Sequence, residues 1–188
     1  EIDAAIEATA GGSAEPVRRW FVPGRIEVLG KHTGYAGGRG LLCTAGRGFC
    51  VAASPRSDLL VRITDVGRGL ATEVPLDGEL VPDATGWSIY AQAVASRIAR
   101  NFPGPLRGAE IVLASDLPRA SGLSSSSALV VSLFTAVAAI NALERHPEYA
   151  AHIAGREDLG AYLGAVEHGR AFRGLDGNRG VGTLGGSE

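Results

Sequence analysis

Residues 116–128 read DLPRASGLSSSSA and stand between two apolar segments of the chain. The run before them, 109–114, predicts a buried strand, and the segment from about 123 to 143 predicts a long apolar helix. Four consecutive serines have two ordinary explanations, a low-complexity linker and a generous helix N-cap. Because this run leads directly from a strand into a helix, we favour a loop that binds phosphate.

A helix start suits that role for physical reasons. It leaves several amide N–H groups unpaired and carries the positive end of the helix dipole. Small residues before it let a polyphosphate lie on those amides, and a serine hydroxyl can complete the shell of a magnesium ion.

A second segment, residues 23–38, reads PGRIEVLGKHTGYAGG. Its alternation predicts a strand with Ile26 and Val28 facing inward, followed by a polar, glycine-rich loop. A surface hairpin with solvated charges explains any one of its polar residues. It explains the whole set less well, because the chain's single lysine falls here. Arginine grips phosphate with two hydrogen bonds and lysine supplies a compact charge. The set comprises Arg25, Lys31, His32 and Tyr35.

The remaining pattern predicts an α+β fold in one unit covering residues 1–188. We expect a short helix at 1–10, short β-rich runs between 17 and 62, and a helix at 86–100 that Pro103 and Pro105 end. Helical stretches at 148–154 and 157–170 precede a glycine-rich tail. The order predicts a mixed sheet with helices packed on one side.

Composition narrows the class of protein. The chain has 188 residues, 45% of them hydrophobic, with a net charge of −2, so it can bury a core and lacks a generally basic surface. The apolar segment 128–143 is shorter than a bilayer span. The two cysteines do not have the spacing of metal ligands. We expect a soluble cytoplasmic protein that binds neither nucleic acid nor membrane.

These segments resemble the GHMP kinases, and within that family the galactokinases. Residues 23–38 match the family's Pro-Gly-Arg-x-x-x-x-Gly-x-His-Thr-x-Tyr-x-Gly-Gly stretch, and Gly122 to Ser126 match its phosphate loop Gly-Leu-Ser-Ser-Ser. Trp87 and Tyr90 match a Trp-x-x-Tyr pair. The resemblance covers roughly residues 18–170, which corresponds to the family's N-terminal ATP-binding domain (ribosomal protein S5 domain 2-like).

The resemblance implies ATP and Mg²⁺ as cofactors and a role for each motif. Arg25 would stabilise charge on the transferred phosphoryl group, Ser126 and Glu167 would hold Mg²⁺, and Trp87 and Tyr90 would line the adenine pocket. The residues implied to hold the ATP phosphates are Arg119, Ala120, Ser121, Gly122, Leu123, Ser124, Ser125, Ser126 and Ser127. Those implied to lie at the sugar are Glu27, Lys31, His32, Gly34 and Tyr35.

Sugar recognition departs from the family pattern. Galactokinases carry Asn, Glu and Asp where this chain has Glu27, Lys31 and Gly34. The family's Glu and Asp hold sugar hydroxyls, so their loss predicts altered or weaker sugar binding. A lysine in place of a carboxylate favours an anionic substituent, such as the phosphate of a sugar phosphate.

The position of the catalytic base also differs from the family pattern. The family's base is an aspartate in a Cys-Gly-x-x-Asp turn shortly after the helix that carries Glu167. Asp176 is one candidate at slightly short spacing, and the other is a residue beyond Glu188. Since the family's C-terminal domain is absent from residues 1–188, we expect a complementary fragment or domain, without which the chain would expose apolar surface.

The sequence therefore predicts an ATP-dependent kinase acting on a sugar or sugar phosphate. Two alternatives stay open. One is a catalytically inactive sensor that binds nucleotide or sugar, and the other is an interaction domain that uses the fold only as a scaffold.

Overall fold

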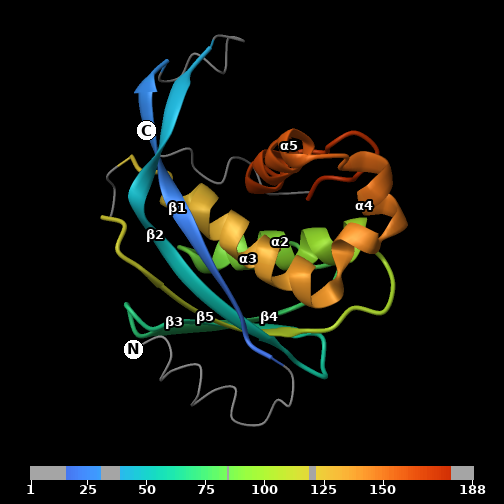
Figure 1. Cartoon of the computed structure of the whole chain (residues 1–188). Coiled ribbons are helices and arrows are strands. Elements are labelled where there is room, and N and C mark those ends of the chain that lie inside the picture. The colour runs from blue at the N-terminus through green and yellow to red at the C-terminus, as the bar shows by residue number, and fades with distance from the viewer. Residues whose placement is uncertain (1–15, 31–38, 84, 119–121, 179–188) are drawn as a thin grey trace.

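The computed structural model describes residues 16–30, 39–83, 85–118 and 122–178. A five-stranded sheet has the order β1-β2-β5-β3-β4 (Figure 1). Neighbouring strands are antiparallel except β3 and β5, which run parallel. The strands are β1 (Arg18–Leu29), β2 (Leu41–Pro55), β3 (Leu60–Asp65), β4 (Leu70–Pro75) and β5 (Ala109–Ser115).

The helices gather on one side of this sheet (Figure 1). α2 and α3 pack on the sheet through a single continuous core, and α5 lies over both helices. The predicted α+β fold with helices on one side is confirmed. The helical elements are α2 (Ser88–Asn101), α3 (Ser125–Asn141), the 3₁₀ turn η2 (Leu143–Arg145), α4 (Pro147–His152) and α5 (Arg156–Glu167).

The central strand β5 is buried along most of its length. Ile111 and Leu113 face the helices, whereas Val112 packs with Ala52 in a small cluster of its own. This burial on alternate sides explains why the strand reads as an unbroken apolar run. α3 is apolar nearly all round because the sheet, α2 and α5 all pack against it.

The first two strands differ from the sequence prediction. Residues 18–29 and 41–55 form two long strands and not four short runs. Pro23 does not end β1, because an edge strand can spare one N–H, and the register shifts between Pro23 and Arg25. Gly48 lies opposite Pro23, and a Cβ there would come 2.2 Å from the carbonyl oxygen of Val22. Pro23 and Gly48 therefore lie where β1 and β2 approach each other closely, and the two-stranded ribbon continues past them.

The predicted inward orientation of Ile26 and Val28 is wrong. Their side chains are 40% and 50% exposed. The ends of β1 and β2 continue as a two-stranded ribbon beyond the helical body (Figure 1), and their partners across the ribbon are also exposed. We call the residues Ile26, Val28, Leu29, Leu41 and Leu42 the hairpin patch.

Other sequence predictions had mixed outcomes. The helix predicted at 86–100 and the strand at 109–114 are present within two residues of their expected bounds. The strand β4 was not predicted; it follows a turn in which Gly69 has a φ of +64°. The helix predicted at 1–10 lies outside the described residues. Among the described helices, none is long and apolar enough to cross a membrane.

Candidate functional site

The two sequence motifs meet in the structure. The amide of Arg25 donates a hydrogen bond to the carbonyl of Leu123 at 3.0 Å, which joins the Pro-Gly-Arg segment to the serine-rich loop. Gly24 makes this approach possible: a Cβ there would lie 2.6 Å from the side chain of Leu117 and 3.0 Å from the Leu123 oxygen. A glycine is needed here because two backbones pass so close together.

The start of α3 has the features of an anion-binding helix end. Gly122 and the N-cap residue Ser124 both have positive φ values, 70° and 54°. Among the described residues no side chain caps the helix, and its first turn carries no acidic residue. A serine in the left-handed conformation is strained, and such strain is typical of functional loops. The amides of this helix start therefore have no acidic residue of their own first turn beside them.

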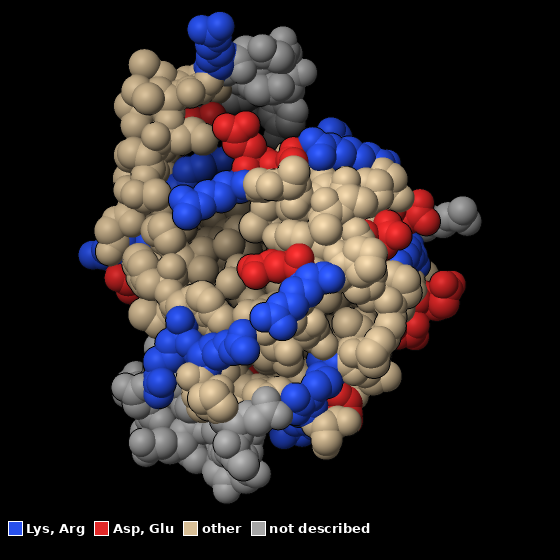
Figure 2. Space-filling view, turned by 45° about the vertical axis from the view of Figure 1, so that its right-hand side comes forward, with Lys and Arg blue, Asp and Glu red and all other residues tan. Residues whose placement is uncertain are grey.

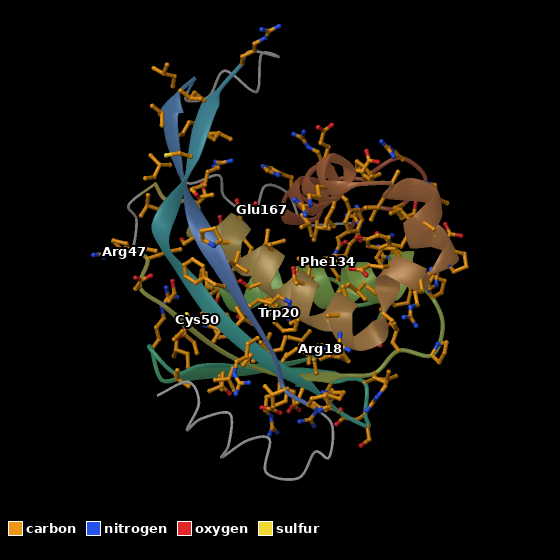
Figure 3. The ribbon with its side chains drawn as sticks, viewed as in Figure 1. Arg18, Trp20, Arg47, Cys50, Phe134 and Glu167 are labelled. Atoms are coloured by element: carbon orange, nitrogen blue, oxygen red, sulfur yellow. The ribbon has the colours of Figure 1, made fainter. Side chains whose placement is uncertain are left out.

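A polar cluster lies beside this helix start. The hydroxyl of Ser127 donates to Oε2 of Glu167 at 2.7 Å, linking the first turn of α3 to the last residue of α5. Figure 3 shows Glu167 beside the same end of α3. Tyr90 of α2 joins the cluster through a hydrogen bond with the side chain of Ser126. Three helices thus bring these four side chains together.

The environment of Tyr90 keeps its hydroxyl protonated. Burial raises the pKa of Tyr90 above its usual value, the negative charge of Glu167 raises it further, and the hydrogen bond with Ser126 opposes both. Tyr90 is therefore available as a neutral hydrogen-bonding group at neutral pH. The predicted adenine-pocket residue Trp87 immediately precedes α2 and packs half-buried against the main core.

The structure places only some of the predicted site residues. Arg25 and Glu27 lie exposed on β1, opposite Thr44 and Leu42 of β2. Ser124, Ser125, Ser126, Ser127, Gly122 and Leu123 are all at or before the start of α3. Seven predicted site residues lie outside the described part of the chain: Lys31, His32, Gly34, Tyr35, Arg119, Ala120 and Ser121.

Asp176, the candidate base, does not join this cluster. Its side chain is exposed, and its carbonyl accepts a hydrogen bond from Asn101 at the end of α2. Tyr90, which contacts Ser126, lies at the other end of that helix, three turns away, or about 16 Å along the axis. The structure therefore separates Asp176 from the serine-rich helix start.

The donor set suits a cation that arrives with a nucleotide. Among the described residues, no group of three or more His, Cys, Asp or Glu side chains could hold a metal by itself. Mg²⁺ typically uses one or two carboxylates together with substrate phosphates and waters. A carboxylate, two serine hydroxyls and a helix start therefore fit MgATP better than a structural metal.

Two contacts of the site were not predicted from sequence. The bond between Arg25 and Leu123 and the bond between Ser127 and Glu167 both join residues far apart in the chain. The four consecutive serines marked Ser127 as polar, but nothing in the sequence indicated that its hydroxyl would turn toward Glu167.

Comparisons with known families agree with this geometry. Residues 89–169 match the model of the GHMP kinases N terminal domain, and residues 7–55 match the galactokinase galactose-binding signature. These matches make the chain similar to the GHMP kinases. Within that family it is similar to the galactokinases.

Curated relatives show the extent of that similarity. The galactokinase of Actinobacillus pleuropneumoniae serotype 5b is 34% identical over 113 residues, covering 60% of this chain and 29% of the relative. The galactokinase of Chloroflexus aggregans is 38% identical over 119 residues, covering 63% of this chain and 30% of the relative. The matched part of this chain thus spans less than a third of each relative's length.

Solved structures extend the match to most of the chain. The Lactococcus lactis galactokinase complexed with galactose superposes with a TM-score of 0.64 and 28% identity, covering 86% of this chain and 42% of that protein. The mevalonate kinase of Methanococcus jannaschii gives a TM-score of 0.63 at 16% identity, covering 82% of this chain and 47% of that protein. The second likeness concerns the fold alone.

Proposed function

We propose that this chain is the nucleotide-binding part of an ATP- and Mg²⁺-dependent kinase that phosphorylates a hydroxyl of a sugar or sugar phosphate. One observation carries the proposal. The hydrogen bond from Arg25 to Leu123 joins the segment matched by the galactose-binding signature to the segment matched by the kinase domain, at the root of the serine-rich loop.

The proposed roles follow from the chemistry of the groups. The uncapped amides at the start of α3 hold the phosphates, and Arg25 lies next to that loop, where its charge stabilises the transferred phosphoryl group. Ser126 and Glu167 hold the magnesium ion, which neutralises phosphate charge when bound. Trp87 lines the adenine pocket. Catalysis of this kind depends on positioning and electrostatics, so rigid elements carry most of these groups.

We further propose an anionic sugar as the substrate, because Lys31 stands where galactokinases carry a carboxylate. Competition binding with galactose, galactose 1-phosphate and heptose phosphates measures the preference. We expect tighter binding of the phosphorylated sugars, and Lys31→Glu should reverse that order whereas Lys31→Arg should not. A preference of the unaltered chain for neutral galactose would contradict this substrate class.

Nucleotide binding and turnover test the kinase proposal itself. Titration with a fluorescent ATP analogue in the presence of Mg²⁺ should show saturable binding that Ser126→Ala weakens about tenfold or more. A panel of sugars and sugar phosphates should then yield ADP. If the chain binds no nucleotide under any of these conditions, the kinase proposal is wrong.

A catalytically inactive sensor is the second candidate. Asp176 is favoured less as a base because its backbone is anchored to the far end of α2. Saturable nucleotide binding without ADP formation, with every sugar tested and with the complementary polypeptide present, would favour the sensor.

We also propose that a second polypeptide segment covers the hairpin patch. Five large aliphatic side chains on a projecting two-stranded ribbon are 40–66% exposed, and a ribbon of this kind is marginal in water without a packed face. The occupant would correspond to the part of galactokinase that this chain does not match. Native mass spectrometry of the material from its source should detect it, and this chain alone would contradict it.

A further inference from the structure

The contact between Ser127 and Glu167 carries an inference about how the site treats different cations. Both side chains are half-buried, and the hydroxyl of Ser127 donates to one specific carboxylate oxygen, Oε2, at 2.7 Å. Within the described part of the chain, no second hydrogen bond engages that carboxylate. One oxygen of Glu167 is therefore occupied by protein, and Oε1 remains for a ligand.

The position of Ser127 on the helix separates its task from that of Ser126. Consecutive residues of an α-helix point about 100° apart, so the two hydroxyls cannot serve the same partner equally well. Ser126 interacts with Tyr90, whereas the proton of Ser127 is used in its bond to Glu167. This proton is therefore not directed at a phosphate.

We propose that Ser127 is a positioning residue that holds Oε2 of Glu167, so that the carboxylate offers a single oxygen to the divalent cation and the site favours Mg²⁺ over Ca²⁺. The inference rests on the proposed function, since it concerns the cation that accompanies the nucleotide. It assigns Ser127 to the carboxylate and not to the ATP phosphates, where the sequence had placed it.

The coordination chemistry of the two cations supports this preference. Mg²⁺ is small and demands nearly ideal octahedral geometry, whereas Ca²⁺ accepts carboxylates through one or two oxygens with flexible geometry. A carboxylate fixed by a neighbouring hydroxyl satisfies Mg²⁺ at low reorganisation cost. A freely rotating carboxylate can bind Ca²⁺ through both oxygens. Loss of the Ser127 hydroxyl should therefore reduce the preference of the site for Mg²⁺ over Ca²⁺.

The backbone that carries Glu167 is held independently of Ser127. On one side of it, the Tyr162 hydroxyl donates to Oδ1 of Asn101 at 3.0 Å, and on the other, Arg97 donates to the carbonyl of Arg170 at 2.7 Å. Because these bonds fix the end of α5, removal of the Ser127 hydroxyl should free the carboxylate without moving the helix. Alanine is also a good helix former at this position.

The experiment compares cation dependence in three chains. The probe is a fluorescent ATP analogue titrated with Mg²⁺ or Ca²⁺, and the readout is the cation concentration that gives half-maximal binding, independent of turnover. We expect Ser127→Ala to raise the Mg²⁺ value about tenfold and to change the Ca²⁺ value much less. Ser127→Thr, which keeps a hydroxyl, should retain the original ratio.

Ser132→Ala is the matched control. Ser132 lies on the same helix, and its buried hydroxyl donates to the carbonyl of Ala128 in that helix at 2.7 Å. This variant should leave both cation values unchanged. Thermal unfolding of each chain verifies that it is folded before titration.

The outcomes separate the two proposals. Suppose that the analogue binds the unaltered chain, but that Ser127→Ala changes the half-maximal concentration of neither cation, or changes both equally. The positioning role is then wrong, whereas the proposed nucleotide site is not contradicted. The same holds if Ser127→Thr behaves like alanine. If the unaltered chain binds no analogue with either cation, the kinase proposal fails and the role of Ser127 fails with it.

Discussion

Gly24 shows how one residue determines whether two distant loops can meet. Gly24→Ala would place a methyl group 2.6 Å from the side chain of Leu117 and 3.0 Å from the Leu123 oxygen. The leucine side chain can shift, but the backbone of the serine-rich loop cannot yield without losing its bond to Arg25. We expect a loss of about 1–3 kcal/mol in the free energy of unfolding, measured by urea denaturation.

Gly46→Ala provides the control for this change. Gly46 lies on the neighbouring strand β2, and a Cβ there would meet nothing within 4 Å. It should change the free energy of unfolding by less than about 0.5 kcal/mol. Equal effects of the two substitutions would mean that the loops do not depend on the close approach at Gly24.

Asp58 should give the chain a stability that depends on acid pH. Hydrogen bonds from the Arg56 guanidinium lower the pKa of Asp58 from 3.8 to about 2, and the Leu60 amide contributes in the same direction. Because the folded pKa is the lower one, ionised Asp58 stabilises the fold above about pH 4, and this contribution is lost as the pH falls toward 2.

Asp58→Asn tests this effect. Melting temperatures measured between pH 2 and 6 should fall more steeply with acidification for the unaltered chain than for the variant, and the two curves should converge near pH 2. Parallel curves across this range would contradict a role for the Asp58 charge.

At this scale, sequence motifs identified chemical groups better than their partners. The family resemblance predicted that Arg25, Ser126 and Glu167 belong to a phosphate site, and the structure brings Ser126 and Glu167 into one cluster. Which hydroxyl contacts the carboxylate depends on how α3 and α5 are rotated against each other. Packing of the whole core determines that rotation, so no local pattern could reveal it.

Among the helices, a buried polar network joins α2 to α5. Arg97 is fully buried, and its Nε donates to Oδ1 of Asn101 at 2.7 Å. Its guanidinium carbon Cζ lies 5.5 Å from the ring centre of Tyr162. Burial raises the pKa of Tyr162, so its hydroxyl remains a donor to the same Asn101 oxygen. This network sets how α5 lies on α2 and thereby where Glu167 falls.

Tyr162→Phe should weaken this helix contact. The ring stays, the hydroxyl is lost, and the Asn101 oxygen keeps its bond from Arg97, so we expect a cost of about 1 kcal/mol in the free energy of unfolding. Tyr149→Phe removes a hydroxyl from a half-buried ring that also packs on Phe102 and should cost less. Urea denaturation measures both, and equal costs would show that the Tyr162 hydroxyl has no special role.

Element boundaries were predictable where one local signal dominated. Pro103 follows the end of α2 as expected, and the apolar run 109–114 is the central strand. Pro23 and the glycines of residues 40–48 wrongly predicted interruptions of the strands. Proline and glycine are tolerated there because the two strands form a ribbon at the edge of the sheet in which the register shifts. Position in the sheet decides their effect, and the local sequence does not contain that position.

For the whole molecule, charge and apolar surface are distributed differently. Basic and acidic side chains are interspersed over the face in Figure 2, while the hairpin patch collects large aliphatic residues at one end of the sheet. Leu29 and Leu41, which are paired across the ribbon, are 66% and 55% exposed. This patch is the surface through which we expect the chain to contact another polypeptide.

Leu29→Glu combined with Leu41→Lys should remove much of this apolar surface while the opposite charges keep the strands paired. We expect the fluorescence of an apolar-surface dye such as anilinonaphthalene sulfonate to fall by about half without a change in melting temperature. Val81→Glu, at an exposed site elsewhere, should leave the signal nearly unchanged. Equal dye signals from the paired variant and the unaltered chain would contradict the patch.

The bond from Arg25 to Leu123 also has a kinetic consequence. Its two residues are far apart in the sequence, since Arg25 lies in the first strand and Leu123 precedes the longest helix. Because closing such a long loop costs more chain entropy than closing the hairpin of β1 and β2, we expect this contact to form after the hairpin. An assembling chain would hence acquire its core before the two loops meet, and a brief local opening there would separate the loops while most of the sheet stayed intact.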